Sequence, residues 1–444
     1  MKPALAPPAR RHPDAKTFEW SVVRMPLAGA VSRCDCGQEC PLEKNPTPHR
    51  LRSVRQLSLV ILIFLLSLLV AGEVCAQSTG QHSSRISLSM PTELRVESTL
   101  WWPTKGSAAR QEYAGSGACA RCHAEKAASQ AVTSMARASM RPSDSQPLKS
   151  HPDLRFNLGA YEYELVTKDG QSLLSVTQGA DSTTKNLEWA VGDSNFGQSY
   201  VYRENGKYYE AQLSYYTVLN GLDVTTGHSR ALPRNAEVAA GGYTPPATIR
   251  ECFGCHFTGA TMSNQFDPDQ SMMGVSCEAC HGPGVTHVAL MASGALDAKG
   301  LIMNPAALSP VDSVDFCGAC HRTYADVVLQ GLARAGVINA RMQPYRLEKS
   351  KCWGRGDARI TCVACHDPHA EVTRDAAFYD SKCLRCHQQR PHSKPLADHP
   401  GKACRVSTKD CVTCHMPKVE VLSTHANFTD HWIRIAHAGE PYPE

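Results

Sequence analysis

One five-residue pattern constrains this chain more than any other feature of its sequence. The pattern is Cys-x-x-Cys-His, and it occurs seven times in 444 residues. Numbered first to seventh in chain order, the motifs contain the cysteine pairs Cys119 and Cys122, Cys252 and Cys255, Cys277 and Cys280, Cys317 and Cys320, Cys362 and Cys365, Cys383 and Cys386, and Cys411 and Cys414. The histidines that follow them directly are His123, His256, His281, His321, His366, His387 and His415. A fold with seven such motifs must make room for whatever they bind.

The pattern is the attachment site for c-type haem, in which both thiols bond to the porphyrin and the histidine ligates the iron. Two other interpretations are weaker. Structural zinc sites pair two Cys-x-x-Cys knuckles and seldom place a histidine directly after every second cysteine. A disulfide framework leaves the seven histidines unexplained. The sequence therefore predicts seven covalently attached haems c, each with one proximal histidine.

An apolar run near the N-terminus predicts export. Residues 57–72 contain no charged side chain, and Arg50, Arg52 and Arg55 precede them. The tripeptide Val-Cys-Ala at residues 74–76 fits a signal-peptide cleavage site. Because the apolar run is short for a membrane span, we expect a cleaved leader and a periplasmic or extracellular protein. Contact with a membrane is expected only if the N-terminal segment is retained.

The charge balance argues against a nucleic-acid partner. The expected leader holds 10 of the 46 Lys and Arg residues and 6 of the 42 Asp and Glu residues, so the remaining chain carries 36 of each sign. Ionised haem propionates would add negative charge. The mature protein therefore has no excess of basic residues with which to bind phosphates, and no nucleic acid is expected as a partner.

The cysteine count agrees with export. Of the 20 cysteines, 14 lie in the motifs and four lie in the leader, which leaves Cys352 and Cys404. Two remaining cysteines in an oxidising compartment predict one disulfide.

Patterning divides the chain into five segments: a leader over 1–76, an N-terminal arm over 77–112, a first haem segment over 113–150, a β-rich insertion over 151–245 and a six-haem segment over 246–444. An Ala-rich helix is expected after the first motif, ending at Pro142. Alternating strands around Asp169-Gly170 and Asn205-Gly206 predict hairpins in the insertion. We expect a mainly α fold with much irregular structure, wrapped around stacked haems and carrying this β-rich hairpin insertion.

One histidine outside the motifs is constrained by its spacing. His369 follows His366 by three residues, across an Asp-Pro pair. This tether is too short to pass around the porphyrin held by the fifth motif. His369 is therefore expected either to ligate a neighbouring haem or to lie in solvent, and we favour ligation.

Several longer segments resemble the multihaem cytochrome c-554 family. They are YAGSGACARCHAEKAASQAVTSMARA (113–138), CEACHGPGVTHV (277–288), MNPAALSP (303–310), CHDPH (365–369), CVTCHMPK (411–418) and HANFTDHWIR (425–434). The likeness covers about residues 113–434. In that family the second histidine of such motifs is commonly a distal iron ligand, which implies this role for His287, His369, His425 and His431. His399 is similar to a further distal position.

The chain departs from the family after its first motif. Many relatives carry a histidine a short helix after that motif, whereas Met135 occupies the region here. On a continuous helix Met135 would lie about 18 Å along the axis from His123, so it could not ligate the haem of its own motif. It either ligates another haem or packs in an apolar stripe with Ala128, Ala131 and Val132.

Two main functions fit these features. The first is an electron carrier that exchanges electrons with redox proteins or quinone-linked donors and acceptors. The second is a multihaem oxidoreductase that converts a small nitrogen or sulfur compound at one open haem, most plausibly the haem on Cys119 and Cys122. All seven motifs end in histidine, and the Cys-x-x-Cys-Lys variant of ammonia-forming nitrite reductases is missing. The sequence favours the carrier, and a conductive extracellular assembly is a weaker third interpretation.

Overall fold

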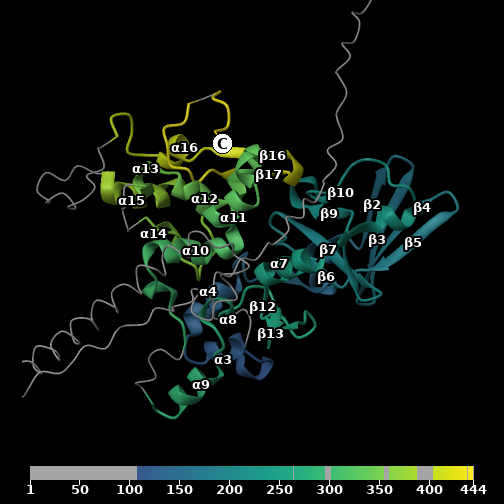
Figure 1. Ribbon diagram of the computed structural model, residues 1–444, viewed down its shortest axis with the longest axis horizontal. Coiled ribbons are helices and arrows are strands. Elements are labelled where there is room, and N and C mark those ends of the chain that lie inside the picture. Colours follow the sequence, from purple (N-terminus) through teal and green to yellow (C-terminus); the bar gives the residue numbers. More distant parts are fainter. Residues whose placement is uncertain are drawn as a thin grey trace, which may run out of the picture. The chain divides into compact units, whose positions relative to one another are not determined.

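The computed structural model describes residues 108–263, 265–295, 302–354, 360–387, 404–437 and 439–443. These residues form short helices and several antiparallel sheets (Figure 1). The fold is therefore mixed, and the expectation of a mainly α fold underestimated the strands. Strand β5 (Asp181–Asn186) shows why, because its sequence DSTTKN has no apolar alternation to reveal it.

Four antiparallel strands follow one another along the chain and form one sheet in the order β2-β3-β4-β5. Strand β2 covers Asp153–Leu158, β3 covers Tyr161–Lys168 and β4 covers Gln171–Gln178. The predicted turn at Asp169-Gly170 joins β3 to β4 and is confirmed by the register. Both turn residues have positive φ, at 51° and 78°, as a type I′ hairpin requires.

A second sheet has the strand order β1-β6-β7-β8-β11, with β9 pairing to both β7 and β10. Its strands are β1 (Ser139–Met140), β6 (Trp189–Val191), β7 (Gly197–Glu204), β8 (Lys207–Ala211), β9 (Leu213–Tyr216), β10 (Gly221–Val224) and β11 (Gly241–Thr244). The predicted Asn205-Gly206 turn connects β7 to β8.

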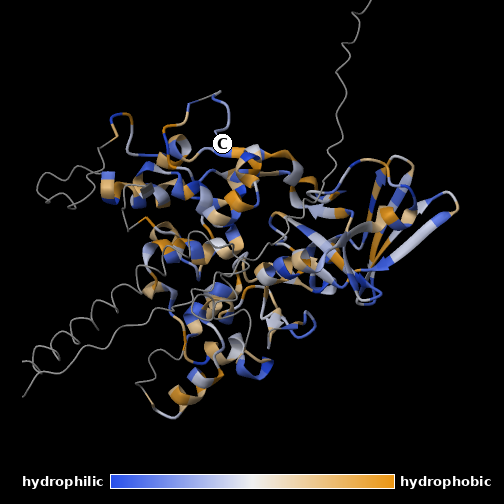
Figure 2. Ribbon diagram, viewed as in Figure 1, coloured by the Kyte–Doolittle hydropathy of each residue, from blue (hydrophilic) through white to orange (hydrophobic). Residues whose placement is uncertain are grey.

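The two sheets share one apolar core. Alternate side chains of β3, such as Tyr161, Tyr163 and Leu165, are buried, whereas those between them face outward. They pack with buried residues of β4, β7 and β9 and with α5 (Gln146–Ser150) and α6 (Ala236–Ala240). The hydropathy colouring shows hydrophobic and hydrophilic residues interspersed along the strands of this region (Figure 2).

Most motifs lie at the end of a short helix or form one. Three of them end the longer helices α7 (Pro246–His256), α10 (Pro310–His321) and α15 (Ala376–His387). The other four coincide with or follow α3 (Ser116–Ala120), α8 (Glu278–His281), α14 (Cys362–Cys365) and α16 (Cys411–His415). Proline in the first turn favours the starts of α7 and α10, because the missing N–H would have no partner there.

The remaining helices connect these elements. They are α4 (Ala124–Ala131), α9 (Val285–Ala292), α11 (Tyr324–Leu329), α12 (Gln343–Glu348) and α13 (Lys351–Gly354), with 3-10 turns η1 (Arg110–Glu112), η2 (Pro142–Asp144), η3 (Thr217–Leu219), η4 (Pro305–Ala307), η5 (Leu332–Arg334), η6 (Gly336–Arg341) and η7 (Leu422–Thr424). Two-stranded sheets pair β12 (Phe257–Thr258) with β15 (Met272–Met273), β13 (Thr261–Met262) with β14 (Gln265–Phe266), and β16 (Lys418–Val421) with β17 (Ala426–Thr429).

The helix after the first motif is shorter than expected. It ends at Ala131 instead of continuing to Pro142. The Thr133 hydroxyl donates to the Gln130 carbonyl, and the Met135 carbonyl accepts from the amide of Ala138, three residues on, and from the amide of the distant Val275. Met135 therefore lies in a turn, and the 18 Å separation expected for a continuous helix does not apply.

The structure also corrects the expected disulfide. Within the described residues, Cys352 and Cys404 are not joined to each other. Cys352 is partly buried on α13, whereas Cys404 is exposed and its Sγ accepts a hydrogen bond from Val406 N. In the part of the chain that the structure describes, no helix is long and apolar enough to cross a membrane. The predicted leader and most of the N-terminal arm lie outside that part.

Candidate haem-binding sites

Each motif places its three functional side chains on one side of a helical turn. In the first motif, the amides of Cys122 and His123 both donate to the carbonyl of Cys119, at 3.1 and 2.9 Å. The third and fifth motifs repeat this turn. The amide of His281 donates a hydrogen bond to the carbonyl of Cys277, and the amide of His366 donates one to the carbonyl of Cys362. Residues three and four positions apart share a helix face, so both thiols and the imidazole can reach one flat ligand.

Backbone carbonyls fix the orientation of several imidazoles. Nδ1 of His256 lies 3.1 Å from the carbonyl of Ala138, Nδ1 of His281 lies 2.8 Å from that of Met303, and Nδ1 of His415 lies 2.8 Å from that of Arg434. A carbonyl can only accept, so Nδ1 must carry the proton in each case. Nε2 is then left unprotonated, which is the arrangement that metal-ligating histidines use.

Burial keeps several of these imidazoles neutral. It lowers the pKa of His256, His321 and His366 below the ordinary value of 6.5. It also lowers the pKa of His431 to about 4. A protonated imidazole has no lone pair for a metal, so these neutral rings suit iron ligation over the whole physiological pH range.

Two pairs of imidazoles face each other across the spacing that one iron needs. The ring centroids of His281 and His369 lie 6.0 Å apart with the planes 11° from parallel. Those of His366 and His431 lie 6.2 Å apart. Two histidines on opposite sides of one metal have centroids about 6 Å apart, since each metal–nitrogen bond is about 2 Å and each nitrogen lies about 1 Å from its ring centroid. The residues present therefore fit a doubly ligated haem at both places.

His369 reaches His281 because its own segment is held in a turn. Its amide donates to the Asp367 carboxylate at 2.9 Å, and Lys126 lies 3.5 Å from the same carboxylate. His431 is held by its Nδ1, which lies 2.9 Å from the carbonyl of Thr429. Each ring therefore faces the histidine of a motif other than the one nearest to it in the sequence.

The other predicted distal ligands lie in different surroundings. His287 lies on α9, and among the described residues its buried Nδ1 has no hydrogen-bond partner. Nε2 of His425 lies 2.8 Å from the Asp223 carboxylate, and its ring contacts the edge of Tyr216. His399 lies outside the described residues.

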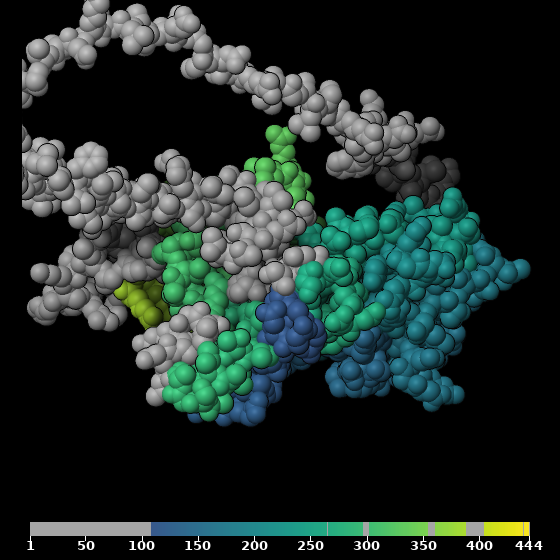
Figure 3. All heavy atoms as spheres, turned by 60° about the horizontal axis from the view of Figure 1, so that its bottom comes forward, coloured from purple at the N-terminus to yellow at the C-terminus, as the bar shows by residue number. Residues whose placement is uncertain are grey.

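The first motif lies beside the third. Glu278, inside the third motif, accepts hydrogen bonds from the amides of Ala114 and Gly115 at 2.7 and 2.8 Å. The Cys277 thiol lies 3.6 Å from the Ser116 hydroxyl. Helix α9, which carries His287, packs against η1, the 3-10 turn that precedes the first motif. Figure 3 shows α9 in green next to the blue residues of the first haem segment.

The other motifs also contact one another in series. The Cys255 thiol of the second motif lies 3.6 Å from the carbonyl of Ala319, inside the fourth. Helix α10 of the fourth motif packs against α14 of the fifth, α14 packs against α15 of the sixth, and α15 packs against α16 of the seventh. Asp380 strengthens the last contact, because its carboxylate accepts from the amides of Asp410 and Cys411 at 2.7 and 2.8 Å.

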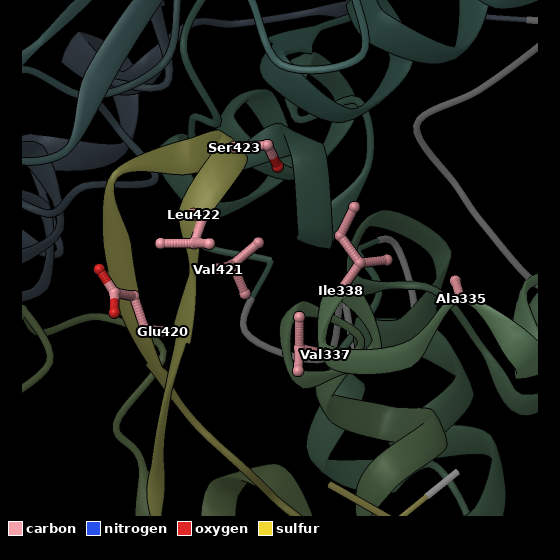
Figure 4. Close-up of a pocket in the computed structure, with 7 residues that line it drawn as sticks. All are labelled: Ala335, Val337, Ile338, Glu420, Val421, Leu422 and Ser423. Atoms are coloured by element: carbon pink, nitrogen blue, oxygen red, sulfur yellow. The ribbon is translucent and has the colours of Figure 1, made fainter. Parts of the chain in front are cut away.

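A hollow of about 440 Å³ lies away from these motifs, between η6 and the β16–β17 hairpin. It is lined by Ala335, Val337, Ile338, Glu420, Val421, Leu422 and Ser423 (Figure 4). The lining contains no cysteine or histidine, so it is not part of a haem-attachment motif. A smaller hollow of about 200 Å³ lies beside the first motif and includes Ser116, Gln130 and Ala131 in its lining.

Comparison with known families adds the decisive observation. A family model described as cytochrome c554 and c-prime matches residues 228–282, which include the second and third motifs. Residues 228–282 form a cytochrome c554 and c-prime domain, which together with the seven motifs indicates a multihaem c-type cytochrome. The predicted family resemblance is thereby confirmed, and haem c is the cofactor that the family implies. A c-type cytochrome generally exchanges electrons with redox partners.

One solved structure was also found to be similar. The crystal structure of the outer cell wall cytochrome OcwA covers 73% of this cytochrome and 80% of its own chain, with 15% sequence identity and a TM-score of 0.36. No curated protein matches the chain.

Proposed function

We propose that this cytochrome is an exported electron carrier with seven haems, one on each Cys-x-x-Cys-His motif. The observation that carries the proposal is the facing of His281 by His369 and of His366 by His431. An iron held between two imidazoles has no position left for a substrate, which suits electron transfer. The same arrangement does not suit catalysis at those two irons.

In this proposal two distal histidines are assigned to particular haems, and three others remain candidates for the remaining irons. His369 is the distal ligand for the haem of the third motif, and His431 is the distal ligand for the haem of the fifth. His287, His399 and His425 remain candidates for other irons, on the basis of family resemblance. His425 would first have to exchange its contact with Asp223 for an iron. Bound haems supply the redox-active irons between which electrons pass.

The order of the motifs in space supports a continuous route. Contacts link the first motif to the third, the fourth to the fifth, the fifth to the sixth and the sixth to the seventh. His369, next to the fifth motif, faces His281 of the third and joins the two groups. The second motif contacts the fourth as a side branch. The first and seventh motifs therefore lie at the two ends of the series, where partners would exchange electrons.

The proposed partners are redox proteins or quinone-linked donors and acceptors outside the cytoplasm. The leader pattern over 1–76 and the thioether chemistry of c-type haem support a periplasmic or extracellular location. A membrane contact would come only from a retained N-terminal segment. The balanced charge of residues 77–444 argues against nucleic acid as a partner.

Spectroscopy of the purified holoprotein tests the carrier function. We expect low-spin ferric signals only, and no binding of carbon monoxide by the ferrous protein. A high-spin signal that shifts with nitrite, hydroxylamine or sulfite, together with turnover, would instead establish the multihaem oxidoreductase. The haem of the first motif is the first place to look for such an open iron. Its loss in a Cys119→Ala, Cys122→Ala variant should then remove the high-spin signal alone.

A further inference from the structure

A buried ion pair lies next to one of the proposed iron ligands. The side chains of Arg346, on α12, and Asp430 are both 0% exposed. Nε and Nη2 of Arg346 donate to the two Asp430 oxygens at 2.8 Å each. Asp430 directly precedes His431 in the chain. This parallel two-bond geometry restrains direction as well as distance.

Aromatic rings enclose the same guanidinium group. Its central carbon lies 4.9 Å from the ring centroid of Trp432 and 4.6 Å from that of Tyr442. The third nitrogen, Nη1, donates to the carbonyl of Pro443 at 2.9 Å. We refer to Arg346, Asp430, Trp432 and Tyr442 as the Arg346 clamp. The clamp uses the planar, multidonor character of arginine, which lysine cannot reproduce.

The clamp and its neighbours fix the backbone on both sides of His431. The Asp430 carboxylate also accepts from the Trp432 amide at 3.1 Å and from Arg434 at 2.7 Å. The Ser350 hydroxyl accepts from the Ile433 amide at 2.8 Å and lies 3.4 Å from the His431 carbonyl. The imidazole between these anchors therefore has little freedom to leave its place opposite His366.

Stability alone does not account for the burial of these charges. Removing two ions from water is costly, and well-packed apolar residues of similar volume often serve a core equally well or better. In some proteins a buried pair instead selects one geometry over its alternatives. Here the selected geometry is that of the residue beside it, whose ring must meet an iron within a few tenths of an ångström.

We propose that Arg346 is a positioning residue that acts through Asp430 to hold His431 on the iron of the fifth motif. This inference rests on the proposed ligation of that iron by His366 and His431. Loss of the clamp is expected to loosen one iron ligand while the haem stays covalently attached through Cys362 and Cys365.

The test uses the holoprotein and counts bound carbon monoxide and low-spin irons. His431→Ala should bind about one carbon monoxide per chain, and Arg346→Met should bind a large part of that amount. The double variant should bind no more than His431→Ala alone, because both changes act on one iron. Arg341→Met is the matched control. Arg341 lies over the ring of Phe428, 5.7 Å from its centroid, and its replacement should leave carbon monoxide binding unchanged.

The outcomes separate the inference from the proposed function. If His431→Ala opens an iron and Arg346→Met leaves every iron low-spin with unchanged potentials, the clamp does not position the ligand. If His431→Ala opens no iron, the proposed ligation itself is wrong. Should Arg346→Met fail to fold with its full haem content, Arg346→Lys decides, because it keeps the positive charge but cannot form both parallel hydrogen bonds to Asp430. A shifted low-spin signal from one iron supports the inference, and an unchanged spectrum overturns it.

Discussion

His369 shows how a short tether can determine which haem a histidine serves. It lies three residues after His366, yet its ring centroid lies 6.0 Å from that of His281 of the third motif. Because one residue then connects two motifs, its loss should affect the third motif and leave its own motif intact. An effect on the third-motif haem alone distinguishes iron ligation by His369 from a role in holding its own segment in place.

We predict that His369→Ala binds about one carbon monoxide per ferrous chain, at the haem of the third motif. Adding Cys277→Ala and Cys280→Ala should abolish that binding, because the responding haem is no longer attached. Adding Cys362→Ala and Cys365→Ala should preserve it. His228→Ala is a suitable control, since both ring nitrogens of His228 already contact protein oxygens. Binding that disappears with the fifth motif instead of the third would contradict the tether argument.

The roles of some residues in the haem sites can be predicted from the sequence, whereas the roles of others cannot. Attachment cysteines and proximal histidines are evident because covalent chemistry demands one fixed spacing. The carbonyls of Ala138 and Met303, which orient His256 and His281, carry no side-chain signal. The contact of His425 with Asp223 joins residues about 200 positions apart, so no local pattern could predict it. Family resemblance indicates a ligand there, whereas the structure shows a carboxylate partner.

Strand β5 illustrates an element held by a charge instead of by apolar residues. The side chain of Lys185 is 5% exposed, and its ammonium group lies 2.9 Å from the Glu204 carboxylate and 2.6 Å from that of Glu237. A cation this deeply buried requires its carboxylate partners to offset its lost hydration. The polar sequence of β5 thus hides an inward-facing residue on an otherwise exposed strand.

We predict that replacing both Glu204 and Glu237 with glutamine destabilises this sheet by about 3 kcal/mol, because Lys185 is left buried without a negative partner. Hydrogen exchange of the β4 and β5 amides measures the local loss. Glu164→Gln is the matched control, because Glu164 pairs with Arg155 on the surface and should contribute less than about 1 kcal/mol. Equal exchange in the double variant and the control would show that the buried pair is not needed.

The same pair predicts a dependence on pH. The hydrogen bond from Lys185 lowers the pKa of Glu237 below its ordinary 4.5. A carboxyl group whose folded pKa is depressed stabilises the protein fully above its unfolded pKa and loses this effect as the pH falls through the folded value. We expect the sheet to lose stability below about pH 4.5. This loss should be smaller in Glu237→Gln, as measured by hydrogen exchange across an acid series. An identical acid profile in both proteins would reject the linkage.

The surroundings of Cys404 predict how fast its thiol reacts. The cysteine count alone had predicted a disulfide between this thiol and Cys352. Backbone N–H groups of Ser407 and Val406 lower the pKa of the exposed Cys404 thiol. A larger thiolate fraction reacts faster, so iodoacetamide should alkylate Cys404 several-fold faster than the partly buried Cys352 in the folded, unreduced protein. Peptide mapping measures both rates. If neither cysteine is labelled until a reductant is added, the disulfide exists.

Local chemistry also explains which elements could be predicted. The turns at Asp169-Gly170 and Asn205-Gly206 were evident because positive φ values strongly favour these residues. The end of α4 at Ala131 was not predictable, because the turn that follows it is held in part by a hydrogen bond from the amide of the distant Val275 to the Met135 carbonyl. Strand β5 was missed because it buries Lys185 in place of an apolar side chain.

The molecule as a whole is organised by contacts between motifs far apart in the sequence. The sequence predicts how many motifs there are, but contacts such as that between Cys277 and Ser116 depend on how the chain folds back. The fifth motif occupies a central position in this network, because α14 packs against both α10 and α15. The first motif contacts its neighbours from one end of the series. Loss of a haem should therefore have different consequences at these two places.

We predict that wild-type protein made with a haem-ligation system carries seven haems by intact mass, and that both double variants below carry six. Replacing Cys119 and Cys122 with alanine should leave the other six haems low-spin and the thermal midpoint nearly unchanged. Replacing Cys362 and Cys365 should lower the midpoint clearly and disturb the third-motif iron through His369. Each porphyrin would bury apolar surface worth on the order of several kcal/mol at about 25 cal/mol per Å², and the fifth motif lies on a helix that packs against the helices of both the fourth and the sixth motif. Equal losses from the two variants would show that the fifth motif is not central.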